Sequence, residues 1–102
     1  KFKEELEEKK DILFKAVKKG DIELMRAVLK AYPIPLTVRK RKYFNNTLLH
    51  EALKHCRLDI CIYLIKQDIS LLNEKNNEGR TPVHYALIYI KDLFVGLLED
   101  YL

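Results

Sequence analysis

Apolar residues along this chain cluster in short stretches that recur at a regular interval. Two six-residue segments, 47–52 and 81–86, both read Thr-x-apolar-His-x-Ala, and the second begins 34 residues after the first. An apolar stretch follows each segment, at 58–65 and at 93–98. This paired pattern predicts short helical units that stack on one another, because one such unit cannot bury its own apolar face.

The repeated segments carry signals for the start of a helix. Thr47 and Thr81 are suited to the N-cap position, where a hydroxyl accepts a bond from an unpaired backbone N–H. Pro82 fits the first helical position, which needs no N–H donor. A His one turn later can bond neighbouring polar groups through its ring. We therefore expect structural roles for His50 and His84.

The segment at 79–86 resembles the start of the ankyrin repeat, Gly-x-Thr-Pro-Leu-His-x-Ala, in all but one marked position. The matching residues are Gly79, Thr81, Pro82, His84 and Ala86. The stretches 57–65 and 91–98 resemble the second helix of such repeats, and residues 69–73 resemble the exit from one. A fainter copy covers 11–29, with Phe14 in place of the motif His. Tetratricopeptide repeats have a similar period, but the chain has no Trp and no Pro that closes a second helix.

The resemblance implies an all-α ankyrin-repeat solenoid of three stacked helix pairs with hairpin-like connections. We expect a charged N-terminal helix or leader over 1–10 and a repeat domain over 11–102. The repeats would span 11–44, 45–78 and 79–102, the last incomplete. The turn inside each pair would fall at Gly20, Cys56 and Ile90. Since neither Cys nor Ile favours a left-handed backbone, either those turns adapt or those units are less stable.

Length and composition limit the classes of protein. A chain of 102 residues suits one domain, and it has no apolar stretch long enough to cross a membrane. The Lys- and Glu-rich start lacks the apolar core of a signal peptide. Two cysteines in one unit are expected to be reduced thiols. These features predict a cytoplasmic protein, with a nuclear location as the alternative because of a run of four basic residues.

Signals for catalysis are missing from the sequence. The three glycines are scattered, so there is no phosphate-binding loop. A zinc set is conceivable from ligand types alone, but the spacings fit no zinc motif. Its members would be His50, His55, Cys56, Cys61 and His84. We expect no enzyme activity, metal, cofactor or small-molecule substrate.

The segment from Pro33 to Asn46 is the strongest candidate for a binding element. Its flanks, 36–38 and 43–44, have strand character, and four basic residues lie between them. We expect a β-hairpin finger with a basic tip beside a concave groove. The alternative is a solvated charged loop.

By resemblance, the function is protein–protein recognition by a scaffold or adaptor, through the groove and the basic finger. The partner is expected to be a protein with an acidic and apolar segment. The alternatives are binding of nucleic acid or anionic lipid, and a regulatory domain of a larger enzyme. The expected partner-binding residues are Lys18, Lys19, Arg39, Lys40, Arg41, Lys42, Tyr43, Phe44, Lys54, His55, Arg80, Ile88 and Tyr89.

The C-terminal end is unusually apolar for the end of a repeat array, where a polar outer face is normal. We expect part of it to be covered by more chain or by a second copy, which would be self-association through this edge. The residues concerned are Leu93, Phe94, Val95, Leu97, Leu98 and Leu102.

Overall fold

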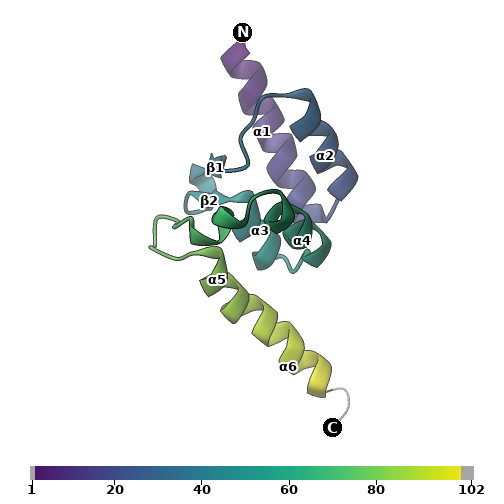
Figure 1. Cartoon of the computed structure of the whole chain (residues 1–102), viewed down its shortest axis with the longest axis vertical. Helices are drawn as coiled ribbons and strands as arrows, with labels where there is room; N and C mark the ends of the chain where they lie inside the picture. The colour runs from purple at the N-terminus through teal and green to yellow at the C-terminus, as the bar shows by residue number, and fades with distance from the viewer. Residues whose placement is uncertain (1, 100–102) are drawn as a thin grey trace.

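The molecule consists of two helix hairpins followed by one long helix that points away from them (Figure 1). The structure, a computed structural model, describes residues 2–99, without the side chains of Phe2, Phe94 and Leu97. The principal extents are 56 × 29 × 24 Å, so the molecule is elongated along the direction of the long helix. The fold is all-α, as the sequence predicts, apart from one short pair of strands.

The first unit pairs α1 (Phe2–Lys19) with α2 (Ile22–Ala31). The charged N-terminal segment is the first part of α1 and not a separate element. The turn at Gly20 has φ +80°, and the chain closes it with bonds from Gly20 N to Val17 O (3.1 Å) and from Asp21 N to Ala16 O (2.8 Å). This is the Schellman arrangement, which satisfies the last carbonyls of a helix. The Asp21 carboxylate then caps α2 by accepting from Leu24 N.

The second unit pairs α3 (Leu48–Lys54) with α4 (Leu58–Gln67) through the same type of turn. Here Cys56 takes the left-handed position with φ +55°. The bonds from Cys56 N to Leu53 O (3.1 Å) and from Arg57 N to Ala52 O (2.8 Å) repeat those of the first unit. The turn has therefore adapted to a residue that disfavours it.

The third unit does not form a helix pair, which corrects one part of the expected architecture. Residues 82–99 form one unbroken helix made of α5 (Pro82–Tyr85), a π-helical segment η3 (Ala86–Ile90) and α6 (Lys91–Glu99). Right-handed helical angles hold at both ends of η3, with φ/ψ of −60°/−44° at Ala86 and −58°/−46° at Lys91. The expected turn falls at Ile90, and a β-branched residue is a poor occupant of a left-handed turn position. The helix continues through it.

The links between units differ from one another. The first contains β1 (Arg39–Lys40), a 3-10 turn η1 (Arg41–Tyr43) and β2 (Asn46–Thr47), with β1 and β2 antiparallel. The second contains a 3-10 segment, η2 (Ile69–Asn73), and a loop without strands over 74–81. The finger of the first link exists as predicted, but its strands lie later than 36–38 and 43–44.

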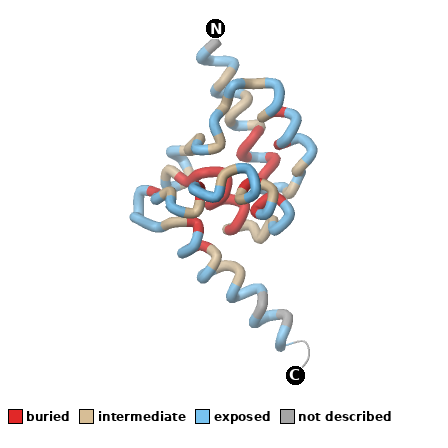
Figure 2. The backbone as a smooth tube through the Cα atoms, viewed as in Figure 1, coloured by how far each residue is buried: buried red, intermediate tan, exposed pale blue. Residues whose placement is uncertain are grey.

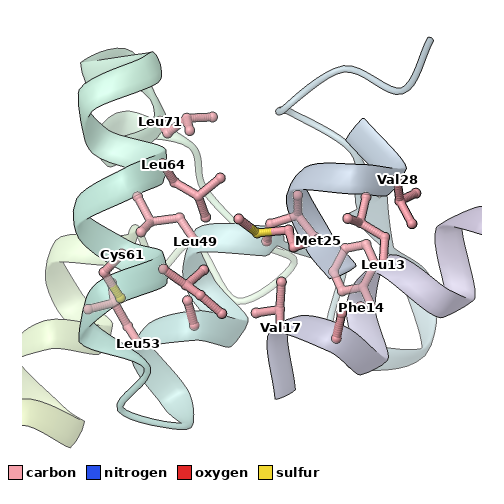
Figure 3. Close-up of a cluster of buried hydrophobic side chains, with 14 of the residues drawn as sticks. Leu13, Phe14, Val17, Met25, Val28, Leu49, Leu53, Cys61, Leu64 and Leu71 are labelled. Carbon is pink, nitrogen blue, oxygen red and sulfur yellow. The ribbon is translucent and has the colours of Figure 1, made fainter. Parts of the chain in front are cut away.

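The apolar core lies between the first two units (Figure 3). Side chains from α1 and α2 meet those from α3 and α4, while the third unit contributes Tyr85 and Pro82 near its start. Burial then decreases along the long helix (Figure 2): Ala86, Tyr89 and Ile90 are partly buried against the core, and the described side chains after them are exposed. The main contributors from the first two units are Leu13, Phe14, Val17, Met25, Leu49, Leu53, Ile60, Leu64 and Leu71.

Candidate functional site

His50 ties the second unit to the third. Its Nδ1 lies 3.2 Å from Thr47 N, and its Nε2 lies 2.9 Å from Arg80 O. Because a backbone N–H only donates and a carbonyl only accepts, the ring must be the neutral tautomer with its proton on Nε2. Burial, the largest cause, lowers the pKa of His50, although the Arg80 carbonyl opposes that shift. The histidine has the structural role that the sequence predicts.

His84 repeats the local half of this arrangement. Its Nδ1 lies 2.9 Å from Thr81 N, and the Thr81 hydroxyl caps the helix in return. The ring is exposed, whereas that of His50 is fully buried. The local cap therefore does not depend on stacking with a following unit.

A buried polar cluster at the base of the finger has no counterpart in the sequence analysis. Asn46 Nδ2 donates to Glu51 Oε2 (2.7 Å) and lies 3.1 Å from Tyr85 Oη. Asn76 Nδ2 donates to Asn46 Oδ1 (2.9 Å) and lies 3.0 Å from the same hydroxyl. Among the side chains that the structure describes, no buried polar atom is left without a partner. These bonds join both links to α3 and α5, so they position the finger.

Arg39 is held by contacts within the chain, although the sequence places it in the basic tip. Its guanidinium donates to Asn45 O (3.1 Å), to Lys75 O (2.7 Å) and to Glu74 Oε2 (2.7 Å). Three acceptors from two links fix the planar donor group. Its charge is already paired, so Arg39 clamps the finger to the second link.

The remaining tip residues line a hollow of about 560 Å³ beside the N-terminal half of α1. We call this the basic hollow, defined by Glu7, Lys10, Lys40, Arg41 and Lys42. Lys40 pairs with Asp11, and its pKa is lowered first by burial and then by Lys10. Within residues 3–99, no ion pair neutralises Lys10, Arg41 or Lys42. The basic hollow therefore has a surplus of positive charge.

Six other predicted residues form a second group. Lys18 and Lys19 end α1, Lys54 and His55 end α3, and Ile88 and Tyr89 lie in η3. Arg57 Nε donates to Lys18 O (3.0 Å), and Cys56 Sγ lies 3.7 Å from Tyr89 O. The pKa of His55 is lowered, mainly by burial. Glu51 opposes the shift, whereas the positive charges of Lys54 and Lys18 add to it. We call this group the helix-end row, defined by Lys18, Lys19, Lys54, His55, Ile88 and Tyr89. Lys10 of the basic hollow and Lys18 of this row are about 12 Å apart along α1, so the predicted residues lie in two separate groups.

The aromatic residues predicted to bind a partner lie in different environments. Tyr43 is half-buried and packs at a tilt on Phe14, with ring centroids 6.4 Å apart. Phe44 is 53% exposed at the end of the finger. Tyr89 is half-buried and stacks edge-on against Tyr85 at 5.5 Å. The Arg80 side chain is exposed, although its backbone bonds His50 and Asn76.

Both cysteines of the chain are free thiols, and Cys61 is buried on α4. Burial raises the pKa of the Cys61 thiol to about 12, so this thiol is a poor nucleophile at neutral pH. In the part of the chain that the structure describes, no three His, Cys, Asp or Glu side chains gather as a metal site would need. No helix of that part is long and apolar enough to span a bilayer.

A second hollow, which the sequence did not predict, lies between α2 and α4. It has a volume of about 590 Å³, and its walls include Arg26, Lys30 and Tyr63. The Arg26 guanidinium sits 5.3 Å from the centre of the Tyr63 ring. Two surface residues 37 positions apart gave no sequence signal that they would meet.

Three curated relatives align with most or half of the chain. Phosphocholine transferase AnkX of Legionella pneumophila is 32% identical over 75 residues, 74% of this chain and 8% of that protein. Putative ankyrin repeat protein FPV233 of Fowlpox virus is 44% identical over 54 residues, 51% of this chain and 10% of that protein. BTB/POZ domain and ankyrin repeat-containing protein NPR3 of Oryza sativa is 28% identical over 88 residues, 85% of this chain and 14% of that protein.

The chain thus spans between 8% and 14% of the length of these relatives. A family model for ankyrin repeats matches residues 13–100 in three copies. The third copy is matched even though its two helices are joined into one in the structure. The capped helix starts, the left-handed turns and this match agree, and the chain belongs to the ankyrin-repeat family.

Proposed function

We propose that this chain is a protein-recognition domain that binds an acidic segment of a partner protein at the basic hollow. The observation that carries the proposal is the group of cations around one concavity, where Glu7 is the single carboxylate in the wall. Repeats of this family generally bind other proteins. Surplus positive charge in a concave site attracts carboxylates and speeds their approach.

Phe44 is the apolar contact that we assign to this site. Its ring is exposed next to the tip cations, and its backbone is fixed by a bond from Asn77 N to Phe44 O (2.9 Å). An exposed aromatic beside charged groups is typical of an interface centre. Tyr89 stays a predicted anchor for the helix-end row, where less of its ring is free.

Selection from a random peptide library displayed on phage tests the proposal. Peptides enriched on the 102-residue chain should contain Asp or Glu near an aromatic or aliphatic residue. Arg41→Glu with Lys42→Glu should slow association of such a peptide, and the loss should shrink at high salt. The matched control is Lys30→Glu with Lys66→Glu, which makes the same charge change at exposed positions on α2 and α4. Equal losses for both variants would contradict a site at the hollow.

Electrostatic binding of nucleic acid or anionic lipid is the competing function, and salt separates it from peptide binding. Affinity for duplex DNA should fall steeply with salt, because each neutralised phosphate releases counterions. Peptide binding anchored by Phe44 should keep most of its affinity, and Phe44→Ala should speed dissociation. Tighter binding to DNA or to phosphatidylserine vesicles than to every selected peptide would overturn the proposal.

The similarity to a named transferase supports a second candidate, in which this chain recognises the protein substrate of a longer enzyme. The proposed site would be the same. In that case Arg41→Glu with Lys42→Glu should raise KM for the protein substrate and leave kcat nearly unchanged. A loss confined to kcat would contradict a recognition role.

A further inference from the structure

The long helix at the C-terminal end leaves a large apolar surface uncovered. Val83, Leu87, Leu93 and Leu98 are between 41% and 66% exposed. Among the described elements, only η3, from which it continues, makes more than marginal contact with α6. From Pro82 to Leu98 the sequence has two ionised side chains, Lys91 and Asp92, which cancel. A helix with so little charge and so much exposed apolar surface is poorly suited to face water.

The repeat pattern provides a cover for this surface from within the chain itself. In the first two units the second helix folds back on the first at Gly20 and at Cys56. The same fold at Ile90 would bring α6 against α5 and η3. Leu87 would then take the place of the buried Val17 and Leu53, and Val95 that of the buried Met25 and Cys61. In the straight helix Leu87 and Val95 are about 12 Å apart along the axis. The apolar faces of α5–η3 and of α6 therefore do not cover each other, as the two helices of a closed repeat would.

We propose that a second copy of this chain covers the long helix by exchange of α6. Two straight helices lie antiparallel, with a two-fold axis near Ile90, so that α6 of each copy packs on α5 and η3 of the other. Leu87 and Val95, whose equivalents in the first two units are buried between the paired helices, are then covered by the other copy. This is domain swapping, which reuses an existing interface and therefore needs no new complementary surface.

A second copy is the occupant because it offers both bare surfaces at once and in the matching order. Pairing about Ile90 makes the interface isologous, because α6 of each copy meets α5 and η3 of the other in the same way. The two ionised side chains lie next to the axis and have opposite signs, so no block of like charge faces itself. The hinge also favours exchange: a residue that resists the closed turn is accommodated in a helix that runs straight.

Sedimentation equilibrium of the 102-residue chain over a range of concentrations tests the exchange. We expect a dimer for the unchanged chain. Ile90→Gly supplies the residue that the closed turn prefers, so it should weaken dimerisation by at least about tenfold. Cys56→Gly is the matched control, because it makes the same kind of change at the equivalent turn of the second unit. It should leave dimerisation unchanged.

A second variant keeps the test decisive if Ile90→Gly folds poorly. Leu87 is 66% exposed, so Leu87→Lys should leave the folded monomer intact while placing two charges in the exchanged interface. Its dimer should dissociate, and its circular dichroism spectrum in dilute solution should match that of the unchanged chain. A monomer at every concentration overturns the proposal, as does a dimer that survives both Leu87→Lys and Ile90→Gly.

Discussion

Replacing Ala52 by Leu tests how tightly the units stack. Ala52 is fully buried on α3, which packs between α1 and α5. Leu adds three carbon atoms at a position with no exposed surface. Its helix propensity is close to that of Ala, so packing dominates the effect. Overpacking of this kind costs about 1–3 kcal/mol. For a domain of this size each kcal/mol lowers Tm by about 4–8 °C.

Ala86 occupies the equivalent position in the third unit and provides an internal control. It is half-buried, because the long helix has not folded back over it. Ala86→Leu should therefore cost less than about 1 kcal/mol. Both variants should be melted in dilute solution, followed by circular dichroism, so that self-association does not cover Ala86.

The comparison between the two variants decides the outcome. If Ala86→Leu destabilises the protein as much as Ala52→Leu, the third unit is closed in solution and the straight helix is not its resting form. If Ala52→Leu leaves Tm unchanged, α3 does not pack between its neighbours as the structure has it. Either result would refute the reasoning from burial.

Three further predictions concern polar groups. Burial lowers the pKa of His50, so the unfolded chain binds a proton at this residue more readily than the folded chain. The contribution of His50 to stability should therefore be complete above about pH 6.5 and be lost on acidification. His50→Gln should make Tm less dependent on pH between about 7.5 and 5.5. Tyr85→Phe should cost about 1 kcal/mol in urea unfolding, because Asn46 and Asn76 keep their mutual bond. Arg39→Lys should cost about 1 kcal/mol, since an ammonium cannot span three acceptors, whereas Arg41→Lys should cost nothing measurable.

The parts of the fold that the sequence predicted depend on neighbouring residues. Thr47 and Thr81 cap their helices and bond the His three residues later, as their spacing indicates. The sequence also marked Cys56 and Ile90 as poor turn residues. It could not tell which turn would still form, because a left-handed residue costs only about 1–2 kcal/mol, which packing elsewhere can offset. Cys56 lies between two well-packed helices, whereas Ile90 leads into a helix with little to pack on.

The candidate site was predicted less completely, because its geometry depends on distant residues. The basic run pointed to a charged finger, and Arg41 and Lys42 are exposed there. The pairing of Arg39 with Glu74, 35 positions away, left no trace in a single sequence. Neither did the contact between Asn46 and Tyr85, 39 positions apart. Such contacts decide which charges remain free, and composition alone could not reveal them.

The buried polar cluster of Asn46, Asn76 and Tyr85 affects how the third unit opens. It attaches the long helix to the body by directional bonds at one end, and beyond Ile90 the described side chains of the helix are exposed. Opening of α6 in a monomer should therefore expose little new surface, with a small heat-capacity change and a weak dependence on urea. In native-state hydrogen exchange, amides of α6 should exchange through such local openings, whereas amides of α3 should exchange only when the whole domain unfolds.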